Sequence, residues 1–272
     1  MKKSAILLFT LLIIQFYCFL ASAQTDGIQT LTKLFEDLAL ASDDHSKIKI
    51  DKLINDEIET NIVAYEDFEA LKKIQGLFPV ISDDGYVKLF TWGYSLSDNS
   101  NRYSGVINYY LKETGRNYTE RLTHSPLDQE ELESKIVSSE NWYGAVYYDI
   151  VSKKFKGHNY YLLLGYDGYN DFINIKMIDA LVLEEDAFAK FGSPVFGSVP
   201  GSVNRLVFRY GERLSMLLKY DRENKVIIWD HLSPSKPELK GYFEYYGPDM
   251  TYDALKFEKG MWLYIPDFIM TN

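Results

Sequence analysis

Residues 142–151 read Trp-Tyr-Gly-Ala-Val-Tyr-Tyr-Asp-Ile-Val, and residues 159–166 read Asn-Tyr-Tyr-Leu-Leu-Leu-Gly-Tyr. Both stretches have the length and the aromatic and β-branched content of strands. Both are apolar on two faces, whereas apolar and charged residues alternate along residues 203–210. A strand that is apolar on both faces must be covered on both, so we expect these two strands at the centre of a sheet.

Period-2 patterns extend outward from this centre, beginning near Ser82. Further strands are predicted at 86–95, 104–112, 118–124, 172–183, 203–210, 214–220, 225–232 and 253–265. Many connections are short and rich in Gly, Asp and Asn, which favours hairpins and antiparallel neighbours. The alternation changes phase near Met177-Ile178, where a bulge would restore the register. A single helix is predicted within this region, over residues 125–139.

The segment before Ser82 has the 3.6-residue period of helices. Apolar stripes at 28–38, 50–58 and 68–74 predict three short amphipathic helices, which end before Pro79. Helices of this kind need a partner surface, so we expect them to pack on the body and to cover its central strands. The fold class is therefore mainly β (α+β), with short N-terminal helices on an antiparallel β sandwich or barrel. An incomplete propeller is the alternative, because aromatic hairpins recur loosely along the chain.

The N-terminus has the features of a secretory signal peptide. Lys2 and Lys3 precede an apolar run, and Ala21-Ser22-Ala23 supplies a small-x-small cleavage site. The predicted organisation is a signal peptide over 1–23, a helical segment over 24–80 and an antiparallel β domain over 81–272. We expect an exported protein, periplasmic or secreted, with Gln24 at its start and no membrane span after cleavage. Lipidation of Cys18 is disfavoured, because the bulky Tyr17 precedes it.

Composition narrows the functional classes. The 272-residue chain is 46% hydrophobic and 25% charged, as globular proteins are, and carries a formal net charge of −10. A nucleic acid partner is therefore not expected. Its single cysteine lies in the signal, which excludes disulfides and cysteine-ligated metals from the mature chain. The four histidines form no metal-binding pair, and no Gly-x-Ser-x-Gly motif occurs, so we expect no metal and no cofactor.

Aromatic residues are the strongest functional signal, with 22 Tyr, 16 Phe and 4 Trp. Exposed aromatic rings on a sheet can stack on sugars or bind apolar peptide side chains. A binding or interaction module for a glycan or peptide is therefore the leading interpretation. Its candidate ligand-binding residues are Tyr143, Tyr147, Tyr166, Tyr169, Tyr242 and Tyr246. The alternative is that these tyrosines are ordinary strand residues of the core.

Acidic residues support a rival interpretation. Asp249 and Asp253, with Glu244, lie near an aromatic segment, and two carboxylates across a cleft can hydrolyse a glycosidic bond. A carboxylate-dependent hydrolase is thus an alternative function, and a structural envelope protein is a third. The acidic loop 167–171 could bind calcium, although Asp-Gly is first of all a hairpin signal.

Three segments carry a resemblance to known sequences. Residues 161–168, 226–232 and 246–249 resemble segments of a group of uncharacterised exported proteins of Gram-negative bacteria. The likeness covers about half of the chain. It implies export and no particular activity.

Overall fold

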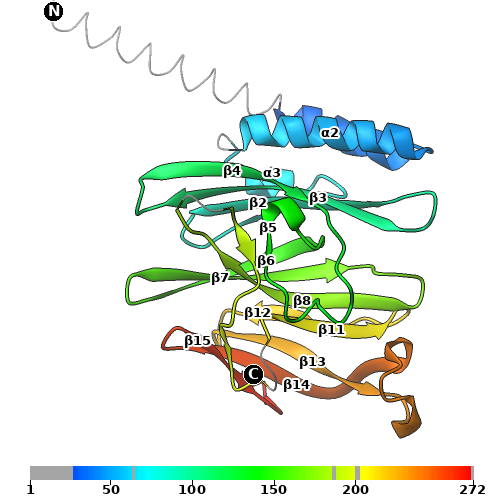
Figure 1. Ribbon diagram of the computed structural model, residues 1–272, viewed down its shortest axis with the longest axis vertical. Helices are drawn as coiled ribbons and strands as arrows, with labels where there is room; N and C mark the ends of the chain where they lie inside the picture. The colour runs from blue at the N-terminus through cyan, green and yellow to red at the C-terminus, as the bar shows by residue number, and fades with distance from the viewer. Residues whose placement is uncertain (1–26, 63–64, 186–187, 200–202, 271–272) are drawn as a thin grey trace, which may run out of the picture. The chain divides into compact units, whose positions relative to one another are not determined.

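The computed structural model describes residues 27–62, 65–185, 188–199 and 203–270 (Figure 1). The chain divides into two compact units, with the boundary between Leu77 and Phe78. The predicted signal peptide and its cleavage site lie outside the described residues. No helix within the described ranges has both the length and the apolar character needed to cross a membrane.

The first unit is helical. A helix over residues 27–40 is followed by α2 (Asp44–Asn61) and α3 (Phe68–Leu71). The break between the first two helices has the predicted capping chemistry, because the Asp43 carboxylate accepts a hydrogen bond from the Ser46 N–H at 2.9 Å. Apolar residues at helical spacing are buried, among them Leu31, Phe35, Leu38, Ile54 and Ile58.

The second unit consists of three β-sheets in the described part of the chain. The first sheet contains, in sequence order, β1 (Phe78–Ile81), β2 (Val87–Ser95), β3 (Asn101–Leu111) and β4 (Arg116–Thr123). The middle sheet has the order β5-β9-β8-β7-β6, and β11 also pairs with β8. Its strands are β5 (Val137–Ser138), β6 (Val146–Phe155), β7 (His158–Asp167), β8 (Ile173–Val182), β9 (Lys190–Phe191) and β11 (Arg205–Gly211), with the 3-10 helix η1 (Ser139–Asn141) after β5.

The third sheet has the order β10-β15-β14-β13-β12. Its strands are β10 (Phe196–Gly197), β12 (Leu218–Asp221), β13 (Val226–Pro234), β14 (Tyr246–Glu258) and β15 (Met261–Ile265), and the 3-10 helices η2 (Pro237–Leu239) and η3 (Phe243–Tyr245) lie between β13 and β14. Neighbouring strands of all three sheets are antiparallel, except for the short parallel pair of β10 and β15. The predicted mainly β, antiparallel class is therefore confirmed.

The three sheets are stacked, with the middle sheet between the other two (Figure 1). On β7, Tyr161 and Leu163 pack in the core shared with the first sheet, whereas Leu162 and Leu164 pack in the core shared with the third. Two sheets of the same unit thus cover the two apolar faces of the stretches 142–151 and 159–166. The expectation that the N-terminal helices provide this cover was wrong. In the described residues the sheets are stacked face to face, whereas the blades of a propeller, complete or incomplete, are arranged around a central channel, so the propeller alternative does not describe them.

Two local predictions were also wrong. Residues 129–134 form turns instead of a helix, and 125–128 and 135–136 have no regular structure, because the Glu133 carbonyl accepts hydrogen bonds from the N–H groups of Asn204 and Arg205 at 2.8 and 3.1 Å. β8 has no bulge near Met177, and its pairing with β7 and β11 is continuous. The alternation fails there because Asp179 lies on an otherwise apolar face, where it is 1% exposed and pairs with Arg205.

Candidate functional site

Two of the predicted ligand-binding tyrosines lie in the protein core. Tyr143 is 5% exposed and Tyr147 is fully buried. The Tyr147 hydroxyl donates to Asp179 Oδ2 at 2.8 Å and accepts from Trp142 Nε1 at 3.3 Å, and its ring stacks on Phe191. These contacts fill the layer between the first and middle sheets. Neither ring is therefore available to an extended ligand, and the alternative of a core role describes both residues.

The hydroxyl of Tyr143 takes part in a second buried network, around Asp167. Tyr143 donates to Asp167 Oδ2, and Tyr103 donates to Asp167 Oδ1 at 2.7 Å. Burial raises the pKa of Asp167 and those of both tyrosines, since each charged form is poorly solvated there. Because both Asp167 oxygens are engaged by the tyrosines, this carboxylate is not open to calcium. No cluster of three metal-ligating side chains occurs among the described residues.

The other four tyrosines are at least partly exposed. Tyr166 is half-buried, and its hydroxyl donates to Asn174 Oδ1 at 2.9 Å. Tyr169 and Tyr242 are 39% and 57% exposed. Tyr246 is half-buried, and its hydroxyl accepts from the Gly241 N–H at 3.0 Å. Of the six candidates, Tyr246 is the one that lines the groove described next.

An aromatic groove of about 340 Å³ lies where β11 faces the third sheet. We define the aromatic groove by the rings of Phe208, Trp229, Phe243, Tyr246 and Tyr264. The centroid of the Trp229 ring is 5.2 Å from that of Phe208 and 6.1 Å from that of Tyr264. The ring centroids of Phe243 and Tyr246 are also 5.2 Å apart. The remaining wall is mostly apolar, with polar groups from three residues, Arg209, His231 and Asp253. A mainly apolar cavity with few convergent polar groups is typical of a ligand site.

A histidine–carboxylate pair lies in the wall of the aromatic groove. His231 Nδ1 is 2.8 Å from Asp253 Oδ2, and Asp253 is 5% exposed. This hydrogen bond raises the pKa of His231 above its ordinary value, despite an opposing effect of burial. The Asp267 N–H donates to the other Asp253 oxygen at 3.3 Å. The ring therefore has a fixed orientation, and its Nε2 is left as the polar contact that the pair can offer to a ligand.

The sequence alone did not reveal this pair. Asp230 and His231 are adjacent on a strand, so their side chains point to opposite faces. The partner of His231 instead comes from β14, where Asp253 is opposite Trp229. The register between β13 and β14 shifts at His231, between Asp230 and Leu232. The pair could have been found from the sequence only by knowing how β13 and β14 are aligned. Their alignment cannot be predicted from the turn, because the connection between them is long.

Arg209 provides the other charged group of the groove wall, and this charge is balanced. Its guanidinium donates to the Gln129 side chain at 2.9 Å, to the Gln129 carbonyl at 3.0 Å and to Glu133 Oε1 at 2.7 Å. It also lies 5.4 Å from the centre of the Phe243 ring, a cation–π contact. With Arg209 paired to Glu133 and His231 paired to Asp253, the aromatic groove favours an uncharged group.

One border of the aromatic groove is a strand edge. The Arg205 N–H donates to the Glu133 carbonyl at 3.1 Å, so it points away from β8. Main-chain groups alternate in direction along an antiparallel strand, so those of Val207 and Arg209 also point away from β8. Neither main-chain N–H donates to any residue in the described ranges. Because Val207 and Arg209 also line the aromatic groove, the cavity and the free edge form one surface.

The carboxylates proposed for hydrolysis are differently placed. Asp249 is exposed and accepts hydrogen bonds from the Ser233 hydroxyl and the Thr251 hydroxyl, both at 2.7 Å. Slight burial opposes these bonds, but they hold the pKa of Asp249 below its ordinary value. A glycosidase needs one carboxylic acid with a raised pKa, so Asp249 does not suit that role. Asp253 is already engaged by His231, and Glu244 is exposed in η3.

No known protein family, no curated protein and no solved structure matches this chain.

Proposed function

We propose that this chain is an exported binding module and that the aromatic groove takes an apolar side chain from an extended peptide. The observation that carries this proposal is the free edge of β11 beside the groove. A peptide added at that edge would bond through its main chain to Val207 and Arg209, and its alternate side chains would point into the groove. A cavity of about 340 Å³ has room for one or two apolar side chains.

A glycan fits this site less well. Sugar rings stack on broad, exposed aromatic faces. Trp229, the largest ring of the groove, is 4% exposed and is packed by Phe208 and Tyr264, so it has no free face of that kind. The groove is also poor in the unpaired polar groups that hydroxyl-rich ligands need, because Arg209 and His231 both have protein partners. These features favour the peptide over the glycan.

Export is supported by the predicted signal peptide and by the resemblance to exported proteins. Mass measurement of the exported protein should find Gln24, free or cyclised, at its N-terminus. A mature chain that retains Cys18, with or without lipid, would contradict this part of the proposal.

The peptide proposal can be tested by selecting phage-displayed random octapeptides on immobilised residues 24–272. Synthetic versions of the selected peptides are then measured by fluorescence anisotropy. Val207→Pro removes the free N–H at a position where an edge strand tolerates proline. Val207→Ala is the matched control, because it trims the side chain and keeps the N–H. We expect Val207→Pro to weaken binding by up to about tenfold, as loss of one hydrogen bond would, and Val207→Ala to weaken it less than about threefold.

Equal binding by the Val207→Pro variant and the wild type would refute pairing at this edge. Failure of every peptide, together with retention of the protein on an immobilised glycan, would favour the glycan instead.

A further inference from the structure

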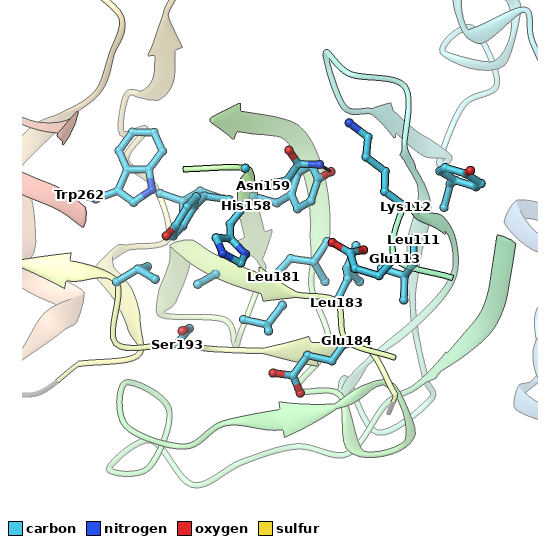
Figure 2. Close-up of a pocket in the computed structure, with 18 residues that line it drawn as sticks. Leu111, Lys112, Glu113, His158, Asn159, Leu181, Leu183, Glu184, Ser193 and Trp262 are labelled. Atoms are coloured by element: carbon cyan, nitrogen blue, oxygen red, sulfur yellow. Dashed lines mark hydrogen bonds between the residues drawn. The ribbon is translucent and has the colours of Figure 1, made fainter. Parts of the chain in front are cut away.

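A second cavity shares no lining residue with the aromatic groove. This pocket has a volume of about 360 Å³ and opens beside the start of β7 and the end of β8 (Figure 2). We call it the β7–β8 pocket. Its walls come from the turn after β3, from both of these strands and from β15. The labelled lining residues are Leu111, Lys112, Glu113, His158, Asn159, Leu181, Leu183, Glu184, Ser193 and Trp262.

The β7–β8 pocket forms where two paired strands separate. The pairing of β7 with β8 ends at Tyr161 and Leu181, although β7 begins at His158. The Gly192 N–H donates to the Ala180 carbonyl, so the main chain of Ala180 points away from β7 and that of Leu181 points toward it. By the same alternation, Asn159 and Leu183 would form the next bonded pair. Neither has a main-chain hydrogen bond across this gap in the described part of the chain.

A buried hydrogen-bond donor lies in the wall of the same pocket. Trp262 is fully buried, and its Nε1 has no acceptor among the described residues. Figure 2 shows the indole at one end of the pocket, with its nitrogen on the side of the ring that faces His158 and Asn159. Buried indole N–H groups normally have a partner, because an unmet donor is costly. A ligand with a hydrogen-bond acceptor at this end of the pocket would supply one.

The other lining residues indicate which chemical groups a ligand of the β7–β8 pocket should carry. Leucine side chains, those of Leu111, Leu181 and Leu183 among them, provide apolar surface. The Lys112 ammonium lies 4.4 Å from the centre of the Tyr86 ring, and Glu184 is paired with Lys190 at 2.6 Å. Glu113 forms no ion pair with a described residue. Lys112 has no carboxylate partner among the described residues either, but its ammonium lies over the Tyr86 ring and points away from Leu181 and Leu183. The Glu113 carboxylate lies on the side of these leucines (Figure 2), so the charge that faces the pocket is negative and favours a cationic group on the ligand.

We infer that the β7–β8 pocket binds a small molecule with an amide carbonyl, an apolar side chain and a protonated amine. An amino acid amide and the amino end of a short peptide share this chemistry. The carbonyl accepts from Trp262 Nε1, the amide bonds to the free main-chain groups of Asn159 and Leu183, and the amine faces Glu113.

The test uses ¹⁵N-labelled protein and the indole N–H signals of its four tryptophans. Trp262→Phe removes and so assigns one signal. L-Leucinamide is the first probe, N-acetyl-L-leucinamide removes its positive charge, and L-leucyl-glycyl-glycine represents the end of a peptide. We expect L-leucinamide to shift the Trp262 signal saturably while the other three signals stay in place. The acetylated probe should bind roughly threefold more weakly, since an exposed ion pair contributes little.

Two blocking variants complete the test. Leu183→Arg and Ser193→Arg fill the pocket and should abolish the shift, whereas Leu214→Arg, at a residue outside the pocket that is 46% exposed, should leave it unchanged. The unperturbed indole signals show whether each variant is folded. A stronger response to the tripeptide than to L-leucinamide would assign the pocket to peptide ends, and the reverse to free amides. The inference is overturned if neither probe moves the Trp262 signal, or if the folded blocking variants respond as the wild type does.

Discussion

Replacing Tyr147 with phenylalanine tests whether this residue is a core residue or a ligand contact. The hydroxyl of Tyr147 is a donor to Asp179, whose carboxylate also pairs with Arg205 Nε at 2.9 Å. Asp179 and Arg205 are 1% and 0% exposed, so water cannot replace a lost partner. The same hydroxyl is an acceptor for Trp142 Nε1. Tyr147→Phe keeps the ring and its stacking on Phe191 and removes both hydrogen bonds.

The size of the effect follows from these two bonds. A hydrogen bond to a buried charged group contributes about 1.5–3 kcal/mol, and an unmet buried donor costs about 1 kcal/mol or more. We therefore expect Tyr147→Phe to lower the free energy of unfolding by about 3 kcal/mol. With a urea m-value of roughly 2–3 kcal/mol/M for a unit of this size, the unfolding midpoint should fall by about 1 M.

The assay is urea unfolding followed by tryptophan fluorescence. Trp92, Trp142, Trp229 and Trp262 all lie after Leu77, so the signal reports on the second unit. Tyr242→Phe is the matched control, because Tyr242 is 57% exposed, and it should change stability by less than about 0.5 kcal/mol. If Tyr147→Phe is equally harmless, the buried network is not what stabilises this layer and the reasoning fails.

Buried tyrosines, the His231–Asp253 pair and a close-packed glycine each make a measurable contribution to stability. Burial raises the pKa of Tyr103, Tyr143 and Tyr147, so their contribution to stability is complete below pH 10 and is lost as the pH rises above it. The free energy of unfolding, measured by urea unfolding between pH 10 and 11, should therefore fall by up to about 1.4 kcal/mol per pH unit for each group. Because the pKa of His231 is raised in the folded state, the contribution of this residue to stability is complete below pH 6.5 and is lost as the pH rises through the folded-state pKa. An NMR titration should show that the pKa of His231 falls in the Asp253→Asn variant. Gly105→Ala should lower the free energy of unfolding by about 2 kcal/mol, measured by urea unfolding, because the new Cβ would lie 2.8 Å from the Phe90 carbonyl oxygen.

Most strands of the second unit could be predicted because the alternation of apolar and polar residues along a strand is a local property of the sequence. Residues 203–210 alternate, and β11 spans Arg205–Gly211. The stretch 253–265 proved to be two strands, β14 and β15, joined by a turn at Lys259-Gly260, both with positive φ. The burial of both faces of residues 159–166 was also foreseen. An apolar pattern shows that a face of a strand is buried, but it does not show which element covers that face. The cover was therefore assigned to the N-terminal helices, although the first and third sheets provide it.

The predicted helix over 125–139 failed for a related reason. Its thin apolar stripe included Leu132, which is fully buried. The main chain at this point, however, bonds to Arg205, whose guanidinium donates to the Leu132 carbonyl at 2.6 Å and whose N–H donates to the Glu133 carbonyl. Contacts more than seventy residues apart in sequence thus outweigh a weak local preference.

The candidate site was hidden by the same long-range contacts. The six tyrosines were chosen for their density, but density does not distinguish a buried ring from an exposed one. Tyr143 and Tyr147 can be buried because each hydroxyl has a buried hydrogen-bond acceptor, Asp167 for Tyr143 and Asp179 for Tyr147. Tyr246 joins the aromatic groove only because β11, η3 and the third sheet come together there.

The stacking of the sheets indicates where this protein can bind a ligand. Both faces of the middle sheet are covered, so a ligand can reach its strands only at an edge or where two strands separate. The two cavities described above are examples, one of each kind. At the edge of β11, the main chain of Val207 has no partner among the described residues and lies beside a mostly apolar groove. Between β7 and β8, the same is true of the main chain of Asn159, which lies beside an indole donor that no described residue accepts from. Free main-chain groups are the feature that peptides and amides match best, because an amide offers a donor and an acceptor at the spacing of a strand. Both sites therefore favour peptide-like ligands, although they share no residue.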